Sequence, residues 1–319
     1  MDKHLRKLTM AASVAAMMAG VPASHAEDRV VAYVKGYTGD EYYTTQECGV
    51  LEAAEKAGVK ATISGAAEWD AGKQSTVLRA VIQTKPDVII IDATDSRAMI
   101  APIQSASEAG IPVMTVGDDI EAEIPFTFLA ANQFRGGEMA ADRMIGKLPS
   151  GGKLLVVGVK PGISSTDQRQ QGFERRIADN KRFQYLGVQY TDNDQNKAAA
   201  VVSATLQAHP DLAGIFAVNL ITAQGAAAAL RQAGVADKVE LVGFDASPTL
   251  ANSLRDGTID ALISQNPREL GVAAVADAVA YLDGKRDFPR RRELDPFMLS
   301  ADNLDTPEGK AAQYVASCD

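Results

Sequence analysis

Apolar, β-branched runs alternate with amphipathic stretches along nearly the whole chain of 319 residues. This alternation is typical of parallel β-strands joined by crossover helices. In the first half the sequence predicts strands at 29–34, 60–64, 87–92, 112–116 and 126–130, and helices at 42–57, 72–84 and 97–109. The second half predicts strands at 153–158, 185–190, 214–218, 239–244 and 260–264 and an extended segment at 297–304, with helices at 134–147, 167–179, 195–208, 221–233, 248–256 and 267–283.

About twelve twisted strands would make an unusually wide single sheet. We therefore expect an α/β protein with two Rossmann-like lobes, each built on its own open parallel sheet. No linker rich in Gly, Pro or Ser separates the two series, and the connection at 131–133 is short. The lobes should move as rigid bodies about a narrow hinge. Ligands bind beyond the carboxyl ends of such strands, so two facing sheets predict a central cleft.

Residues 1–26 have a basic start, an apolar run and the small-x-small sequence Ser24-His25-Ala26. This pattern predicts an export signal that is cleaved near Ala26, and hence a periplasmic protein. There is no cysteine at the cleavage point, which argues against a lipid anchor. The formal net charge of −9 makes nucleic acid an improbable partner.

Cys48 and Cys318 are the only cysteines. An exported protein meets an oxidising compartment, so one alternative is a disulfide between the two. The alternative is a buried free Cys48 and a free Cys318 at a frayed end. A thiol assay on the denatured chain would distinguish these two states.

Polar side chains end several strands of the second series. Asn219, Asp245 and Gln265 each follow a strand directly, and Arg169 lies on the helix after the first strand of that series. Each could serve only as a helix cap or a surface group, but neighbouring strand ends should point to one place. Carboxylate, carboxamide and guanidinium groups together suit a small neutral ligand that is rich in hydroxyls.

The first series offers a second polar group. Asp40 falls at a helix start, with Tyr42 and Tyr43 in the first turn, and Asp118 and Asp119 follow the fourth strand. Asp40 could be a plain N-cap with two packing tyrosines, and adjacent acids are often only solvated. In the alternative, the rings and carboxylates of this group face the ligand. Trp69 could be a ring at the cleft rim or a surface packing residue.

Features of catalysis or cofactor binding are lacking. His209 is the one histidine beyond the predicted signal, and it stands in a turn without a serine or cysteine partner. No His, Cys or acidic cluster has the spacing of metal ligands. The stretch 65–75 fails the phosphate-loop pattern because six residues separate Gly65 from Gly72 and Gln74 replaces Ser or Thr. We expect no cofactor, no metal and no enzymatic activity.

The chain resembles the periplasmic sugar-binding proteins of the ribose-binding type, the soluble receptors of ABC importers. The resemblance rests on "DVIIIDATDSRAMIAPIQSASEAGIPVMTV" (87–116), "AHPDLAGIFAVN" (208–219) and "ELVGFDASP" (240–248), in that order. It implies a sugar site in which Arg169, Asn219, Asp245 and Gln265 form hydrogen bonds and Phe244 gives support. It also implies that Tyr42 and Tyr43 sandwich the sugar, and that Asp40 stands where asparagine is usual.

Two departures put the identity of the sugar in doubt. Gly117-Asp118 replaces an Asp-Arg pair, and Asn193 replaces a stacking aromatic residue of the second lobe. These changes admit a different pentose or a linear polyol. The resemblance further implies three crossings between lobes, with an N-terminal lobe of 27–131 plus 266–293 and a C-terminal lobe of 132–265 plus 294–319. The partners it implies are a sugar and a membrane permease that recognises the closed, monomeric receptor.

Two other functions remain open from the residues alone. An exported sugar hydrolase could use the carboxylates of Asp118, Asp119 and Asp245. A chemosensory or signalling receptor would use the same closure as a transport receptor. A repressor is set aside because an export signal stands where a DNA-binding headpiece would be, and because the net charge is negative.

Overall fold

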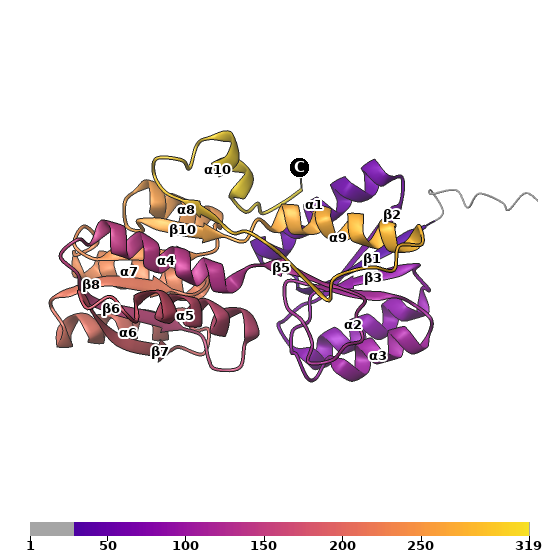
Figure 1. The fold of residues 1–319 in the computed structure, drawn as a ribbon, viewed down its shortest axis with the longest axis horizontal. Helices are drawn as coiled ribbons and strands as arrows, with labels where there is room; N and C mark the ends of the chain where they lie inside the picture. Colours follow the sequence, from indigo (N-terminus) through magenta and orange to yellow (C-terminus); the bar gives the residue numbers. More distant parts are fainter. Residues whose placement is uncertain (1–28, 319) are drawn as a thin grey trace, which may run out of the picture.

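The computed structural model describes residues 29–318, so the predicted export signal and its cleavage point near Ala26 lie outside the described residues. Two six-stranded sheets lie side by side, each with helices on both faces, and each forms the centre of one lobe (Figure 1). The expectation of an α/β fold with two Rossmann-like lobes is confirmed.

The N-terminal lobe contains a fully parallel sheet in the order β11-β5-β4-β3-β1-β2. Helices α1 and α9 cover one face of this sheet, and α2 and α3 cover the other (Figure 1). Its elements are β1 (Val30–Tyr37), α1 (Glu41–Ala57), β2 (Lys60–Ala66), α2 (Ala71–Gln83), β3 (Val88–Ile91), α3 (Ile100–Glu108), β4 (Val113–Val116), β5 (Phe128–Ala131), α9 (Pro267–Leu282) and β11 (Arg291–Leu294).

The C-terminal lobe repeats this plan in the order β12-β10-β9-β8-β6-β7, with β12 as an antiparallel edge strand. Its elements are α4 (Gln133–Lys147), β6 (Gly152–Gly158), α5 (Ser164–Ile177), β7 (Phe183–Tyr190), α6 (Gln195–Ala208), β8 (Leu212–Ala217), α7 (Leu220–Ala233), β9 (Glu240–Phe244), α8 (Pro248–Arg255), β10 (Ala261–Ser264), β12 (Phe297–Leu299) and α10 (Pro307–Ala312).

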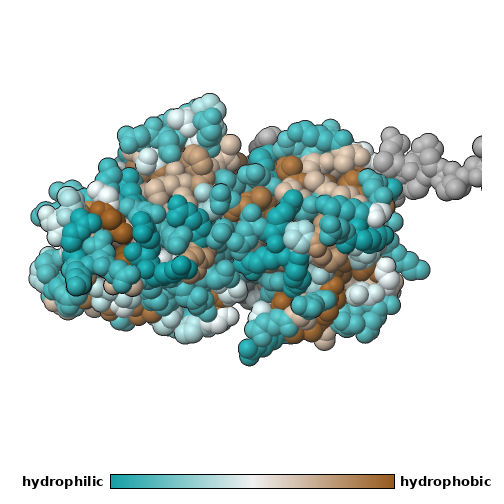
Figure 2. All heavy atoms as spheres, viewed as in Figure 1, coloured by the Kyte–Doolittle hydropathy of each residue, from teal (hydrophilic) through white to brown (hydrophobic). Residues whose placement is uncertain are grey.

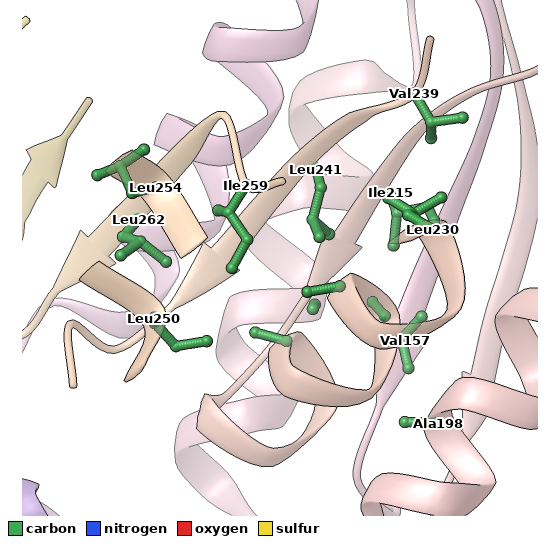
Figure 3. Packing of buried hydrophobic residues seen from close by; sticks show 14 of the residues in the cluster. Val157, Ala198, Ile215, Leu230, Val239, Leu241, Leu250, Leu254, Ile259 and Leu262 are labelled. Atoms are coloured by element: carbon green, nitrogen blue, oxygen red, sulfur yellow. The ribbon is translucent and has the colours of Figure 1, made fainter. Parts of the chain in front are cut away.

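Each sheet has an apolar core on both faces, which explains why the central strands are hydrophobic at nearly every position. β3 is Val-Ile-Ile-Ile and is fully buried. In the C-terminal lobe, Leu241 of β9 and Leu262 of β10 pack under Leu250 of α8 and Leu230 of α7 (Figure 3). Burying one such side chain stabilises the fold by about 1.5–3 kcal/mol.

Polar caps fix where the helices begin, and these starts are at the carboxyl ends of the strands. Asp40 caps α1 by accepting a hydrogen bond from the backbone N–H of Tyr42. Asn219 caps α7 in a reciprocal capping box with Thr222. At the other end, Gly58 and Gly234 take left-handed backbone conformations that close α1 and α7.

The chain passes between the two sheets after β5, after β10 and after β11. β5 therefore leads directly into α4, β10 into α9, and β11 into β12. Each passage is only a few residues long, as Figure 1 shows between the lobes. The lobes are held at fixed pivots and not joined by a flexible tether.

The C-terminal region differs from the sequence expectation. β11 was not expected, because Arg-Arg-Glu-Leu has no apolar run and becomes a strand only by pairing with the edge strand β5. The predicted extended segment 297–304 is a strand only as far as Leu299. The side chain of Asn303 accepts a hydrogen bond from the backbone N–H of Ser300, which turns the chain there. The short helix α10 follows and was also not expected.

Cys48 of α1 and Cys318 are joined in a disulfide. Of the two states that the sequence left open, the bridged one is therefore present. Figure 1 shows the C-terminal end beside α1, although α10 belongs to the other lobe.

Figure 2 shows the same face of the molecule as mainly hydrophilic, with apolar side chains in small separate groups. Among residues 29–318, no helix combines the length and hydropathy needed to cross a membrane.

Candidate functional site

A central cavity of about 550 Å³ lies between the lobes, at the carboxyl ends of strands from both sheets. This volume is in the range of sites for small organic ligands. Both lobes contribute to its wall. The side chains on which the chemistry depends are Tyr37, Asp40, Tyr42, Tyr43, Trp69 and Asp118 from the N-terminal lobe, and Gln133, Lys160, Arg169, Asp192, Asn193, Asn219, Asp245, Gln265 and Tyr314 from the rest of the chain.

An aromatic wall lines the N-terminal side of the central cavity. Tyr42 and Tyr43, in the first turn of α1, lie edge to face with their ring centroids 5.1 Å apart. Tyr37, at the end of β1, contacts Tyr43 with centroids 5.6 Å apart, and Trp69 lies 6.0 Å from Tyr37. Such edge-to-face arrangements hold the rings in place. Trp69 is 44% exposed and forms the rim of the wall.

Asp40 is positioned beside this wall by two hydrogen bonds. Its Oδ1 accepts from the backbone N–H of Tyr42 at 2.7 Å, and its Oδ2 accepts from the Tyr37 hydroxyl at 3.0 Å. Burial first, and then the negative charge of Asp245, raise the pKa of Asp40 to about 6, against the lowering effect of both hydrogen bonds. A carboxyl with this pKa can both accept and donate near neutral pH.

Two more acids lie behind the wall, where Gly117 leaves space for them. A Cβ at Gly117 would collide with Oδ2 of Asp92, and the Tyr42 hydroxyl would be only 3.0 Å away. Asp92 is 1% exposed, and neither of its oxygens has a hydrogen-bond partner among the described residues. Burial first, and the charge of Asp118 second, raise its pKa well above the usual range. Burial also raises the pKa of Asp118, while Arg169 and Ser165 of the other lobe lower it.

Arg169 is held rigidly on the opposite wall. Its Nε donates to Oε1 of Gln133 at 2.8 Å, and its Nη1 donates to the backbone carbonyl of Val218 at 2.8 Å. The guanidinium carbon stacks 3.7 Å from the centroid of the Phe244 ring. Although only 4% exposed, Arg169 keeps further N–H donors that can face the cavity. The planar fork is thus oriented in advance of any ligand.

Asp245 is the centre of a buried hydrogen-bond network at the end of β9. Its Oδ1 accepts from Gln265 Nε2 at 2.7 Å and from the Tyr314 hydroxyl at 2.9 Å, and its Oδ2 accepts from the backbone N–H of Leu220 at 3.1 Å. Gln265 in turn accepts from Gln133 Nε2 at 2.9 Å. The carboxylate is therefore fixed by three partners that are far apart in the sequence.

Unusual backbone conformations gather at the central cavity. Five described non-glycine residues have positive φ, and three of these line the cavity, namely Asp192 (53°), Asn193 (57°) and Asp245 (73°). A fourth, Asn266, follows Gln265 directly. Left-handed backbone costs about 1 kcal/mol or more in residues with a Cβ, and Asn and Asp tolerate it best. This backbone conformation directs the side chains of Asp192, Asn193 and Asp245 toward the cavity. Asn193 Oδ1 accepts a hydrogen bond from Asn219 Nδ2 at 2.8 Å.

The structure brings most of the residues expected from the sequence together at this cavity. Nine of the eleven candidates line it, namely Asp40, Tyr42, Tyr43, Asp118, Arg169, Asn193, Asn219, Asp245 and Gln265. Asp119 instead turns back toward its own strand β4, where it accepts from Thr115 at 2.7 Å, and it pairs with Arg290, just before β11, at 2.9 Å. Phe244 is fully buried beneath Arg169, so its contact with the cavity is indirect.

Several lining residues were not expected from the sequence. Tyr37 is the last residue of β1, and Gln133 is the first residue of α4, immediately after a lobe crossing. Both occupy the same kind of strand-end position as Asn219 and Asp245, so the sequence contains a signal for them as well. Asp92, which lies behind the aromatic wall and does not line the cavity, follows β3 in the same way. Tyr314 carries no such signal, because only the path of the C-terminal segment brings it to the site.

The fold, the crossings and the cleft define the class of two-lobed solute-binding proteins. The family model described as "Periplasmic binding protein domain" matches residues 31–286. The chain belongs to the periplasmic binding protein family. This finding confirms the resemblance drawn from the sequence motifs.

Relatives include importer binding proteins of known name. The ribose import binding protein RbsB of Bacillus subtilis is 33% identical over 245 residues, which cover 77% of this chain and 79% of the relative. A solute-binding protein of an ABC transporter from Agrobacterium vitis, solved with α-D-tagatopyranose, is 35% identical with a TM-score of 0.84, covering 90% of this chain and 99% of that one. Another from the same organism, solved with D-fucose, is 27% identical with a TM-score of 0.80 over 89% of this chain and 100% of that one.

Proposed function

We propose that this protein captures one neutral monosaccharide, a pentose or a hexose, or a related polyol, by closing its lobes on it, and delivers it to the permease of an ABC importer. The observation that carries this proposal is the central cavity itself. Rigid planar polar groups from one lobe face an aromatic wall and a carboxyl from the other. The sugars named for the relatives, ribose, tagatose and fucose, belong to the same chemical class.

The chemistry of the lining matches that of a sugar. Each hydroxyl both donates and accepts, which suits Asp245, Asn219 and Arg169, while the CH faces of a ring can lie against Tyr42 and Tyr43. About eight hydrogen bonds at about 1 kcal/mol each, and nearer 2 for charged partners, exceed the cost of association. The expected affinity is about micromolar or tighter.

The charges of the lining exclude anionic ligands. Asp40, Asp118, Asp192 and Asp245 face the central cavity, against the two cations Lys160 and Arg169. A phosphorylated sugar or a sugar acid would meet unpaired negative charge in a poorly solvated space. The ligand is therefore a neutral sugar.

We further propose that the protein binds its sugar without converting it. Hydrolysis needs a free carboxyl acid and a partner that acts as base or nucleophile. Both oxygens of Asp245 already accept hydrogen bonds from the protein, and both oxygens of Asp40 do as well. Such carboxyls suit fixed recognition of hydroxyls. Proton NMR of each sugar after incubation with the protein tests this, and any new product signal would contradict it.

The primary experiment is a melting-shift screen followed by calorimetry. The screen includes pentoses, hexoses, their polyols and, as negative controls, a sugar phosphate and a sugar acid. We expect one or a few neutral members to raise the melting temperature, and the charged analogues to have no effect. If no neutral sugar shifts the melting temperature, or if the anionic analogues bind as tightly as the neutral ones, the proposal is wrong.

Asp245→Ala provides the matching prediction at the site. It removes an acceptor of ligand hydroxyls and releases Gln265 and Tyr314, so binding of the identified sugar should weaken by about 100-fold or more. Asp237→Ala, on the exposed loop before β9, is the control and should bind normally. Calorimetry measures both, and circular dichroism verifies that each variant is folded. Equal affinity of Asp245→Ala and the parent would remove Asp245 from the site.

A further inference from the structure

The C-terminal segment 313–318, which we name the tail strap, joins the two lobes a fourth time. It leaves the C-terminal lobe after α10, where Tyr314 N–H donates to the backbone carbonyl of Ala246 at 2.9 Å. The next residue, Val315, donates its N–H to Thr45 Oγ1 of α1 at 2.8 Å. Cys318 then bonds to Cys48 of the same helix. The disulfide therefore closes the passage from one lobe to the other covalently. Figure 1 shows the chain running from α10 to a position beside α1.

Tyr314 lies at the point where the tail strap meets the central cavity. It is 3% exposed and lines the cavity wall. Its hydroxyl donates to Asp245 Oδ1 at 2.9 Å and accepts from the backbone N–H of Gln265 at 3.3 Å. Its ring meets the ring of Tyr42, from the N-terminal lobe, with centroids 6.0 Å apart at 64°. One side chain thus contacts both walls of the cavity.

The length of the tail strap limits how far its ends can separate. Tyr314 is fixed to the C-terminal lobe and Cys318 to α1, so the two anchors are four residue-to-residue steps apart, with three residues between them. A fully extended chain covers at most about 3.6 Å per residue, or about 14 Å in all. Opening of the lobes beyond that reach requires Tyr314 to leave Asp245 or the disulfide to break.

We propose that the tail strap, while the disulfide is intact, limits the separation of the lobes and holds Tyr314 as a positioning residue for Asp245. The part concerning ligand affinity rests on the sugar-binding function proposed above. The hydroxyl of Tyr314 orients the carboxylate that receives ligand hydroxyls. Its ring maintains contact with Tyr42, which belongs to the aromatic wall.

The first experiment needs no ligand. Small-angle X-ray scattering compares the ligand-free protein with and without reductant, and Cys318→Ser is the matched control. The chain has only two cysteines, so a reductant acts on this one bond. We expect reduction to increase the radius of gyration of the parent to the value of Cys318→Ser, and to leave that variant unchanged. An identical radius in all four samples overturns the limit on opening.

The second experiment separates positioning from stability. Tyr314→Phe retains the ring and removes the hydroxyl, so sugar affinity should fall by about tenfold, as expected for loss of one hydrogen bond to a charged group. Tyr190→Phe, on the exposed outer strand β7, is the control and should retain its affinity. A Tyr314→Phe protein with a lower melting temperature but unchanged affinity would show Tyr314 to be only structural. If the parent binds no sugar, the sugar-binding function fails, and the scattering experiment still decides whether the tail strap limits opening.

Discussion

Carboxyl groups at the central cavity differ in how the protein satisfies them. Asp245 has three protein partners and Asp40 has two, while Asp92 has none among the described residues. An unpaired carboxylate in a buried place costs several kcal/mol, so Asp92 favours its protonated form. A protonated carboxyl donates a hydrogen bond, which a carboxylate cannot do.

Asp40 gives a prediction on pH and stability. Its pKa is about 6 in the folded protein and 3.8 as the reference for the unfolded chain, so the folded state holds the proton more tightly. Stability is therefore gained as pH falls from 7 through 6, and the gain is complete near pH 4. Asp40→Asn cannot titrate, and it can retain both contacts if its Oδ1 accepts from the Tyr42 N–H and its Nδ2 donates to the Tyr37 hydroxyl. Between pH 7 and pH 5 the parent should gain about 1 kcal/mol in free energy of unfolding relative to the variant, after allowance for solvent screening.

Urea denaturation without ligand at the two pH values measures this difference. Asp70→Asn makes the same change at the N-cap of α2, away from the cavity, and controls for the loss of a capping carboxylate. Parallel pH profiles for the parent and Asp40→Asn would contradict the raised pKa of Asp40.

At the scale of single residues, the sequence predicted those that follow a strand or begin a helix. Asn219, Asp245 and Gln265 converge because parallel strands end at one edge, and this needs only the strand assignments. Asp119 followed the same logic but lies one residue too far, where Arg290 of a distant segment reaches it. Tyr314 could not be found this way, since the tail strap is placed by long-range contacts with Ala246 and Cys48.

Among the elements, close packing of α4 against α5 determines where Arg169 lies. Gly137 of α4 meets the backbone of Arg169, and Gly172 of α5 meets the backbone of Phe134, so closely that a Cβ would overlap either carbonyl. Glycine is needed at both positions because the two helices touch backbone to backbone. This contact keeps the guanidinium over Phe244 and within reach of Gln133.

Gly172→Ala should therefore destabilise the protein and disturb the site. We expect a loss of about 2–3 kcal/mol in the free energy of unfolding, because the added methyl separates two helices in a packed core. Sugar affinity should fall as well, since Arg169 moves with α5. Gly146→Ala, near the exposed end of α4 with open space around it, is the control and should be neutral or stabilise by up to about 1 kcal/mol. Chemical denaturation and calorimetry measure both quantities, and equal stability of the two variants would rule out the close contact.

The sequence predicted the helices and strands correctly where the local hydrophobic pattern matches the burial of the element in the fold. β3 and β9 are continuous apolar runs bounded by polar residues, and they formed where expected. β11 depends on pairing with β5 from a distant part of the chain, so its sequence alone does not specify it. β12 lies within the expected extended segment 297–304, and only its antiparallel pairing with β10 was not expected. The boundaries of β5 shifted from 126–130 to Phe128–Ala131 because its pairing with β4 begins at Phe128.

For the whole molecule, the disulfide closes a loop with a sequence separation of 270 residues. A crosslink of this length restricts the unfolded chain strongly, although measured effects are usually smaller than the loop entropy suggests. We expect reduction to lower the free energy of unfolding by about 2–5 kcal/mol. Guanidinium denaturation of the parent with and without reductant measures this loss. The stability of Cys318→Ser should not change when reductant is added. A parent that unfolds at the same denaturant concentration in both conditions would contradict the expectation.

The three crossings have a consequence for how the chain reaches its native state. Helix α9 supplies Leu270, Ala274 and Val275 to the core of the N-terminal lobe, and β11 completes its sheet, yet both come from the last fifth of the sequence. The sheet of the C-terminal lobe is likewise incomplete until its edge strand β12 has been added. A chain that emerges in order from a ribosome or a translocation channel can therefore finish neither lobe until synthesis or transit is almost complete. We therefore expect both lobes to acquire their final packing late, only after residues 267–299 have become available.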